Sequence, residues 1–294
     1  MEFARYHPGI NCLYFTAVLA GTVLFRQPVF LVLSYVCALL CLLHLRGLRA
    51  LIPGLGLLPA AALFALWYGA YHHFGVTVLG VNFIGNQITL EAFLCGGTWA
   101  MVCVAEVLWL GCVHAVFTTD KIVYLLGRVS PRASLYLSIL LRTMPRLNKQ
   151  RKRIDLAQRG IGRGKGQGHL LRRMGNALRR GSILLTWLTE GIVTTSDSMR
   201  CRGCSLRGRT AFSLYRFDNR DRGFVVGMCA LMGVLVMAML LDQTMIRFAP
   251  QVVMMPITPL SGLFYAAWAI LCLLPPGLEI IDRCRFRRLQ QTIG

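Results

Sequence analysis

Acidic residues are scarce in this sequence: 12 of its 294 residues are Asp or Glu, against 32 that are Lys or Arg. Charged residues of both signs together make up only 15% of the chain, whereas hydrophobic residues make up 55%. So few charged side chains exclude an ordinary soluble domain. With a mean hydropathy of +0.57, the chain is expected to be an all-α integral membrane protein.

The residue patterns that bind metals and phosphates are incomplete. Cys201 and Cys204 form one CxxC pair with no second pair nearby, and His169 is the only histidine between 118 and 222, so a four-ligand zinc site is not expected. The glycine-rich stretch 160–168 follows a predicted helix and lacks the GxxxxGK[ST] spacing of a phosphate loop. We therefore expect no metal, no cofactor and no catalytic residue, and the chain is not predicted to be an enzyme.

Eleven cysteines are scattered through the chain, most of them inside apolar runs. A thiol in such a run behaves as a small hydrophobic side chain. A disulfide framework is therefore not expected.

Six apolar runs are long enough to suggest transmembrane helices. The first two are short for a hydrocarbon core of ~30 Å, which needs ~20 helical residues, and Gln27-Pro28 separates them by a turn. No small-residue cleavage site follows the first run, so it is expected to be an uncleaved span. The runs are 10–26, 28–45, 51–73, 89–117, 223–246 and 257–281.

Basic residues indicate how these spans are oriented. With six spans, one side receives Arg5, the 46–49 loop, the polar insert and the C-terminal tail, while the other side receives only Arg26 and Arg247. Because cytoplasmic loops carry the excess of Lys and Arg, both termini are predicted to be cytoplasmic.

The polar insert divides the chain into three regions. Residues 118–222 hold 23 basic and 6 acidic side chains, which is most of the net charge of +20. The expected organisation is a transmembrane region of about four spans at 1–117, a cytoplasmic insert at 118–222, and about two spans with a basic tail at 223–294.

Apolar residues recur at helical spacing within the insert. Ser130 is a predicted N-cap for a helix that Pro145 should kink and that ends near Gly160. A second helix is predicted from Leu170 to Arg202. Its apolar middle is too short to span a membrane, so this amphipathic helix is expected to lie along the membrane surface, covered on one side by the transmembrane body or a partner.

Each predicted helix ends in an Arg-Gly pair, Arg159-Gly160 and Arg202-Gly203. A small residue precedes each pair, Ala157 in the first case and Ser198 in the second. Two interpretations are open. Glycine in the left-handed conformation commonly ends a helix, and arginine favours the negative end of the helix dipole. An exposed guanidinium could instead bind a carboxylate or a helix C-terminus of a partner protein.

The run "TTDKIVYLLGRVSPRASLYLSILLRTMPRLNKQRKRIDLAQRG", residues 118–160, followed by "SDSMRCRG", residues 196–203, resembles the T component of energy-coupling factor (ECF) transporters. That family includes the cobalt-transport permease CbiQ. The resemblance implies that two cytoplasmic coupling helices dock by their ends onto two ABC ATPase subunits. Arg163-Gly164 is an alternative to the first motif. The implied docking residues are Ala157, Arg159, Gly160, Ser198, Arg202 and Gly203.

The function implied by the resemblance is that of a non-catalytic subunit in the plasma membrane of a prokaryote. It would transmit ATP-driven movement to a membrane-embedded, substrate-binding S component for uptake of a vitamin or transition-metal ion. Apolar residues of the insert would then form the S-component seat: Leu137, Leu141, Met144, Leu184, Trp187 and Leu188.

Two other functions are considered. A carboxylate within a span, Glu106, could couple ion movement in a stand-alone secondary transporter, with His114 about 80° around the same helix. Such a transporter should contain an internal repeat, and none is visible. The basic insert could bind nucleic acid, but it offers few aromatic residues for stacking, and we expect no nucleic-acid partner.

Overall fold

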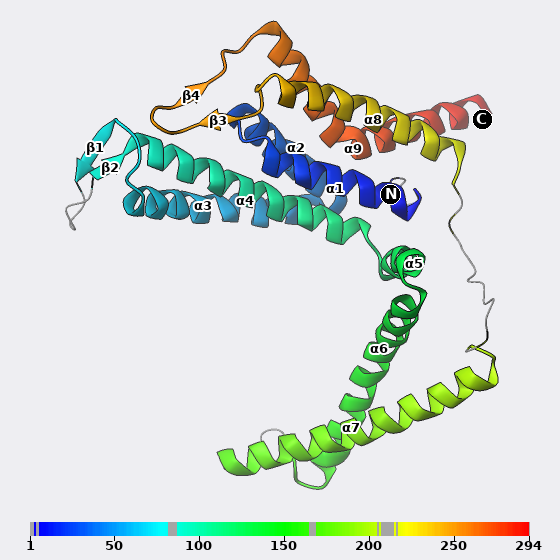
Figure 1. Cartoon of the computed structure of the whole chain (residues 1–294). Coiled ribbons are helices and arrows are strands. Elements are labelled where there is room, and N and C mark those ends of the chain that lie inside the picture. Colours follow the sequence, from blue (N-terminus) through cyan, green and yellow to red (C-terminus); the bar gives the residue numbers. More distant parts are fainter. Residues whose placement is uncertain are drawn as a thin grey trace. The chain divides into compact units, whose positions relative to one another are not determined.

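The computed structural model describes residues 3, 6–81, 87–164, 169–204, 206, 215 and 217–293, and these residues are mainly helical (Figure 1). Arg5, residues 165–168 of the glycine-rich stretch and the side chains of Arg283, Arg285, Arg287 and Arg288 lie outside this description. The helices are α1 (Pro8–Leu24), α2 (Pro28–Arg46), the 3-10 turn η2 (Gly47–Ala50), α3 (Leu51–Tyr71), α4 (Leu90–Val116), α5 (Thr119–Val129), α6 (Pro131–Gly160), α7 (Leu170–Cys201), α8 (Asn219–Leu240) and α9 (Pro259–Ile293). Two antiparallel hairpins are formed by β1 (Val78–Val81) with β2 (Gln87–Thr89) and by β3 (Ile246–Arg247) with β4 (Val253–Met254).

The chain forms two compact units. The first consists of Met1–Thr118 and Tyr215–Gly294 and holds α1 to α4, α8, α9 and both hairpins. The second, Thr119–Leu214, holds α5, α6 and α7.

Helices of the first unit are long and apolar enough to cross a membrane. In the described part of the chain, four helical stretches meet this condition: Pro28–Tyr71, Leu90–Val116, Asn219–Leu240 and Pro259–Ile280. Helix α1 is apolar but has only 17 residues. The helical structure and these apolar stretches agree with the predicted all-α membrane fold. The count of six spans stays a prediction.

The stretch Pro28–Tyr71 reverses direction at its centre. Gly47 ends α2 with a φ of 67°, which favours glycine. The Tyr35 hydroxyl donates a hydrogen bond of 3.1 Å to the Gly54 carbonyl. In one straight helix these residues would lie about 28 Å apart. Helices α2 and α3 therefore form a helical hairpin, and each is about as long as one membrane crossing.

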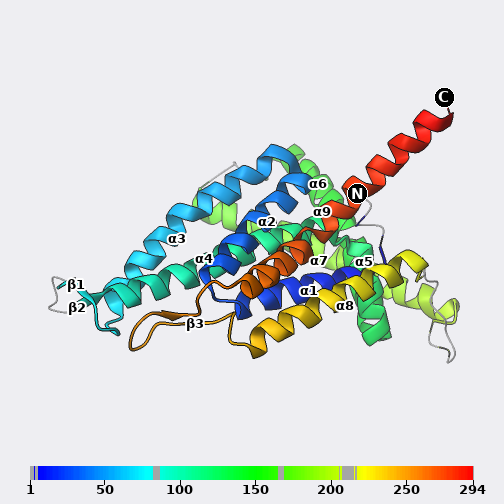
Figure 2. The ribbon, with the colours of Figure 1, turned by 90° about the horizontal axis from the view of Figure 1, so that it is seen from above.

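Successive helices of the first unit run in alternating directions, so the connections gather at its two ends (Figures 1 and 2). One end carries both β-hairpins and the turn between α1 and α2, where the Gln27 N–H donates to the Thr244 carbonyl at 3.0 Å. The other end carries the turn between α2 and α3. Arg46 and Arg49 lie in that turn, whereas Arg26 and Arg247 lie at the hairpin end.

The core of the first unit lies among α1, α2, α4, α8 and α9. Its largest fully buried side chains include Trp109, Trp268 and Phe30. The indole N–H of Trp109 donates to the Ser34 hydroxyl at 3.0 Å, which joins α4 to α2. The expected role of thiols as small apolar side chains fits the buried positions of Cys37, Cys41, Cys112 and Cys272.

A pair of prolines interrupts the hydrogen bonding of α9. Pro275 and Pro276 lack backbone N–H groups, so the carbonyls of Leu271 and Cys272, four residues earlier, lose their helical donors. The buried Tyr14 hydroxyl of α1 donates instead to the Cys272 carbonyl at 3.0 Å. This contact satisfies a carbonyl group in the apolar core.

Candidate functional site

Helix α6 begins at a capped N-terminus. The predicted N-cap Ser130 accepts a hydrogen bond of 3.5 Å from the Ala133 N–H. The helix continues through Pro145 to Gly160, and its 30 residues reach about 45 Å. The kink expected at Pro145 stays a prediction. Helix α6 is thus long enough to connect distant partners.

Helix α5 is held against the start of α6. The Ser134 hydroxyl of α6 donates a hydrogen bond of 2.9 Å to the Val123 carbonyl of α5. Lys121 in the first turns of α5 is buried, and this burial lowers the pKa of its ammonium group to about 8. Helices α5 and α6 therefore form a connected pair.

Helix α7 is also long and is largely open to its surroundings. It begins at the predicted Leu170 and ends at Cys201, one residue before the predicted Arg202. Its 32 residues reach about 48 Å, and none of its side chains is buried. A surface of this length is available to partner molecules.

An ion pair joins α6 to α7 where the two helices cross (Figure 1). The Arg180 guanidinium donates a hydrogen bond of 2.8 Å to the Asp155 carboxylate. Both side chains are shielded, with exposed fractions of 13% and 15%. Ile154 and Leu184 line the groove beside this pair. Shielding strengthens the charge-assisted bond and makes it a defined point of attachment.

The C-terminus of α6 is closed by a Schellman motif. The Gly162 N–H donates to the Arg159 carbonyl at 3.0 Å, and the Arg163 N–H donates to the Gln158 carbonyl at 2.9 Å. Gly162 has a φ of 76°, the left-handed conformation that this motif requires. The glycine that ends α6 is therefore Gly162.

The C-terminus of α7 has the same geometry. The Gly203 N–H donates to the Arg200 carbonyl at 3.0 Å, and the Cys204 N–H donates to the Met199 carbonyl at 3.0 Å. Gly203 has a φ of 70°. Both helices thus end in the same six-residue hydrogen-bond pattern.

Aligning the two helix ends on their left-handed glycines identifies equivalent residues. A small residue stands five positions before the glycine in both, Ala157 in α6 and Ser198 in α7. An arginine stands three positions before it in both, Arg159 and Arg200. The pattern shared by the two ends is a small residue, any residue, arginine, two further residues and glycine.

This alignment corrects one expectation about the Arg-Gly pairs. Gly203 is left-handed as predicted, but Gly160 is still helical, and Gly162 takes the left-handed position. Arg202 consequently corresponds to Ile161, a residue without charge. The reason is that α6 keeps its helical hydrogen bonds two residues further than the first Arg-Gly pair suggested.

The residues predicted to dock the ATPases are accessible. The Arg159 side chain is 65% exposed, and its guanidinium lies 4.0 Å from Asp155 in the same helix. The alternative first motif is less open, because Arg163 is exposed but Gly164 is buried. The other docking residues, all exposed except the half-buried Gly203, are Ala157, Gly160, Ser198 and Arg202.

The predicted S-component seat is only partly accessible. Met144 on α6 is 53% exposed. The other five members, Leu137, Leu141, Leu184, Trp187 and Leu188, are half-buried.

A different apolar surface of α7 is more exposed, and its residues were not among those predicted to bind a partner. We call it the apolar stripe. Its residues recur at spacings of three, four and seven, which is the signal by which the stripe could have been found. They are Leu171, Met174, Leu178, Leu185 and Ile192, with exposed fractions of 81%, 64%, 74%, 60% and 56%.

Glu106, the carboxylate considered for ion coupling, lies within the long apolar helix α4. Its Oε1 atom is buried and has no hydrogen-bond partner in the described part of the chain. His114, expected on a neighbouring face, is exposed. No hydrogen bond between these two side chains is present among the described residues.

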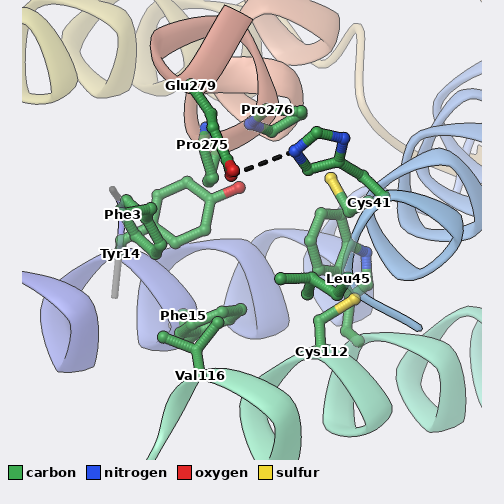
Figure 3. A pocket seen from close by; sticks show the side chains of 12 residues that line it. Phe3, Tyr14, Phe15, Cys41, Leu45, Cys112, Val116, Pro275, Pro276 and Glu279 are labelled. Atoms are coloured by element: carbon green, nitrogen blue, oxygen red, sulfur yellow. Dashed lines mark ion pairs between the residues drawn. The ribbon is translucent and has the colours of Figure 1, made fainter. Parts of the chain in front are cut away.

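A second pair of titratable residues, which was not predicted from the sequence, lies beside a pocket of the first unit (Figure 3). His44 Nε2 of α2 is 3.0 Å from Glu279 Oε2 of α9. Tyr14, Cys41 and Pro276 line the same pocket. Because 235 residues separate His44 from Glu279, no local pattern could have paired them. The contact ties α2 to α9 beyond the proline pair.

In the part of the chain that the structure describes, no group of three His, Cys, Asp or Glu side chains is placed to hold a metal ion. Cys201 of the CxxC pair is exposed and Cys204 is half-buried. A scan against protein-family models and a search of curated proteins found no match to this sequence.

Proposed function

We propose that this chain is the energy-coupling T component of an ECF-type importer. In this proposal it is a non-catalytic membrane subunit that receives movement from two cytoplasmic ABC ATPases. It passes that movement to an S component that binds a vitamin or a transition-metal ion. The observation that carries the proposal is the matched geometry of the α6 and α7 ends.

Two equivalent helix ends suit a pair of homologous partners. Each end offers an exposed arginine three residues before the left-handed glycine, Arg159 in α6 and Arg200 in α7. Each also has a small residue two positions earlier, which lets a partner backbone approach. A guanidinium in such a position can bind a carboxylate or a helix C-terminus through two parallel hydrogen bonds.

The crossing of α6 and α7 supports transmission of movement between those ends. Helices of about 45 and 48 Å are stiff, and the shielded Asp155–Arg180 pair joins them at one point. A displacement applied at one helix end is then carried to the rest of the unit as a rigid-body motion.

The same proposal implies how the first unit is oriented in the membrane and where the S component binds. The end of the first unit that carries Arg46 and Arg49 faces the cytoplasm of a prokaryotic cell, together with both termini. The S component rests on the S-component seat, of which Met144 is the most exposed residue. The membrane partners are thus the S component and lipid.

Charge reversal at the helix ends tests the proposal. Arg159→Glu and Arg200→Glu should each weaken ATPase attachment, because losing a charge-assisted contact in an interface costs about 2 to 5 kcal/mol. Arg202→Glu decides between two assignments of the α7 docking residue. It should weaken ATPase attachment if the Arg-Gly pair itself docks, and it should have little effect if Arg200 docks. Arg163→Glu provides the matched control, because Arg163 follows the left-handed glycine. Co-purification of the ATPases and substrate uptake in cells are the measurements.

Two results would contradict the proposal. If Arg159→Glu and Arg200→Glu both retain ATPases and transport normally, neither helix end docks a partner. If the wild-type chain purifies from its own membranes without any ATPase, the coupling role itself fails.

A stand-alone secondary transporter is the second candidate, favoured by the buried Oε1 atom of Glu106 that lacks a partner. A carboxylate within a membrane span usually has a functional role. Glu106→Gln should abolish transport under that mechanism in proteoliposomes that contain this chain alone. Under the coupling mechanism the chain alone should transport nothing, with or without the substitution.

A further inference from the structure

Methionines cluster at the end of the first unit that carries both hairpins. Five of the chain's 12 methionines lie between positions 237 and 255, in less than a tenth of its length. All five are exposed, with exposed fractions of 38% to 53%, and none belongs to the buried core cluster of the described residues. The apolar surface of α8 accounts for the two on that helix, whereas the three at the hairpin β3–β4 lie outside the membrane helices. The five are Met237, Met239, Met245, Met254 and Met255.

The hairpin β3–β4 brings two of these methionines opposite each other. Its register pairs Ile246 with Met254. Continuing that register by one residue pairs Met245, which precedes β3, with Met255, which follows β4. Residues directly opposite in an antiparallel pair point to the same face, with Cβ atoms about 4.5 to 5.5 Å apart. Two thioether sulfurs placed in this way can bind the same ion.

The backbone restrains both positions. The Gln27 N–H donates a hydrogen bond of 3.0 Å to the carbonyl of Thr244, the residue before Met245, and Gln27 and Thr244 are both buried. Met255 precedes Pro256, and a residue before proline is restricted to extended backbone. The pair is therefore held by two segments of limited freedom, which lowers the entropy lost when an ion binds.

The ligands that this segment offers are soft and neutral. Residues 230–271 contain no Cys, His, Glu or Lys. Their only carboxylate, Asp242, accepts a hydrogen bond of 3.0 Å from the Arg247 guanidinium, so these two charges compensate each other. Hard cations such as Mg²⁺ and Ca²⁺ prefer carboxylate and carbonyl oxygens, whereas thioethers prefer soft ions such as Cu(I).

We propose that Met245 and Met255 form a binding site for a soft monovalent metal ion, Cu(I) or its analogue Ag(I). A thioether needs no deprotonation to bind a metal, unlike a thiol. The zinc and phosphate-loop patterns that the sequence lacks do not include this kind of ligand. The site does not rest on the coupling proposal, because it consists of residues of this chain alone.

Titration of the full-length chain with Ag(I) tests the site directly. The chain is purified in detergent with ¹³C-labelled methionine methyl groups and studied by NMR in chloride-free buffer. The methyl signals of Met245 and Met255 should shift together and saturate with one dissociation constant. Exposed and half-buried cysteines are first replaced by serine so that their thiols do not compete: Cys12, Cys103, Cys201, Cys204, Cys229 and Cys284.

Leucine substitutions separate the pair from single thioethers. Met245→Leu should abolish the Ag(I)-dependent shift of the Met255 signal, and Met255→Leu should abolish that of Met245. The reason is that the second thioether binds intramolecularly and raises the affinity of the first. Leucine is close to methionine in volume, so the fold should be retained. Met254→Leu is the matched control, because Met254 follows the opposite face of the same strand and both shifts should persist.

Selectivity is measured on the same signals. Cu(I) added under anaerobic, reducing conditions should shift the signals that Ag(I) shifts, and Mg²⁺ or Zn²⁺ should not. Equal shifts with Zn²⁺ would contradict a soft-metal site.

Three further outcomes would overturn the proposal. Unchanged Met245 and Met255 signals at saturating Ag(I) mean that the hairpin binds no soft ion. If the exposed Met144 and Met174 shift at the same Ag(I) concentrations, the response is that of any accessible thioether. If the Met255 signal still shifts with unchanged affinity in Met245→Leu, the two residues do not share an ion.

Discussion

The Arg180 guanidinium of α7 donates a hydrogen bond of 2.8 Å to the Asp155 carboxylate of α6, and both groups are largely shielded from solvent. This pair fixes one point along two helices that otherwise expose most of their length. This charge-assisted contact therefore contributes to the register between the two helix ends.

Removing that contact should loosen the crossing. Asp155→Ala leaves Arg180 without its partner, and loss of a hydrogen bond to a charged group costs about 1.5 to 3 kcal/mol. Spin labels at the exposed positions Leu140 and Ile192 should then give a broader distance distribution in pulsed electron paramagnetic resonance. The charge swap Asp155→Arg with Arg180→Asp should restore the narrow distribution. An unchanged distribution in Asp155→Ala would show that other contacts hold the crossing.

The glycines at the end of α6 should respond differently to alanine. Gly162→Ala places a side chain at a φ of 76° and should cost about 1 to 2 kcal/mol locally. Gly160→Ala lies in the helix with open space around it and should be neutral or stabilising by up to about 1 kcal/mol. Hydrogen exchange of the last turn of α6 measures both effects. Faster exchange in Gly160→Ala than in Gly162→Ala would contradict the alignment of the two helix ends.

The prolines of α9 and Tyr14 should be energetically coupled. Tyr14→Phe removes the hydroxyl that donates to the Cys272 carbonyl and leaves that carbonyl only the weak thiol donor of Cys41, so it should destabilise the first unit by about 0.5 to 1.5 kcal/mol. Pro276→Ala restores a backbone N–H that can donate to the same carbonyl. Thermal unfolding in detergent should therefore show a smaller effect of Tyr14→Phe in the Pro276→Ala background. Pro275→Ala is the matched control, because its N–H would serve the carbonyl of Leu271. Equal effects of Tyr14→Phe in all three backgrounds would contradict this account.

The orientation of the first unit can be measured with an impermeant thiol reagent. Leu79→Cys lies on strand β1, is exposed at the hairpin end and should react in intact cells, in a background without reactive native cysteines. Leu156→Cys lies on an exposed part of α6 and should react only after the membrane is opened. The reverse labelling pattern would place the basic insert outside the cell and exclude docking of cytoplasmic ATPases.

Much of the helical architecture was predictable because it depends on local patterns. Length and apolar composition select membrane helices, and periodicity with capping residues places α7 within one residue of its expected bounds, 170–202. The position of Arg159 as a basic residue in the last turn of a helix was predicted in the same way, and its role in docking an ATPase stays a prediction. Each of these features depends on residues within a few helical turns of one another.

The amino-acid sequence alone thus determined that this is an all-α membrane protein with two long amphipathic helices in a basic insert. Only the tertiary structure decided which glycine ends α6. Gly160 and Gly162 tolerate a left-handed backbone equally, and the end lies where helical hydrogen bonding stops. Tertiary packing also decided which apolar face of α7 stays exposed, and it brought together Asp155 with Arg180 and Tyr14 with Cys272. Such pairings join residues far apart in the chain, so no periodicity or spacing encodes them.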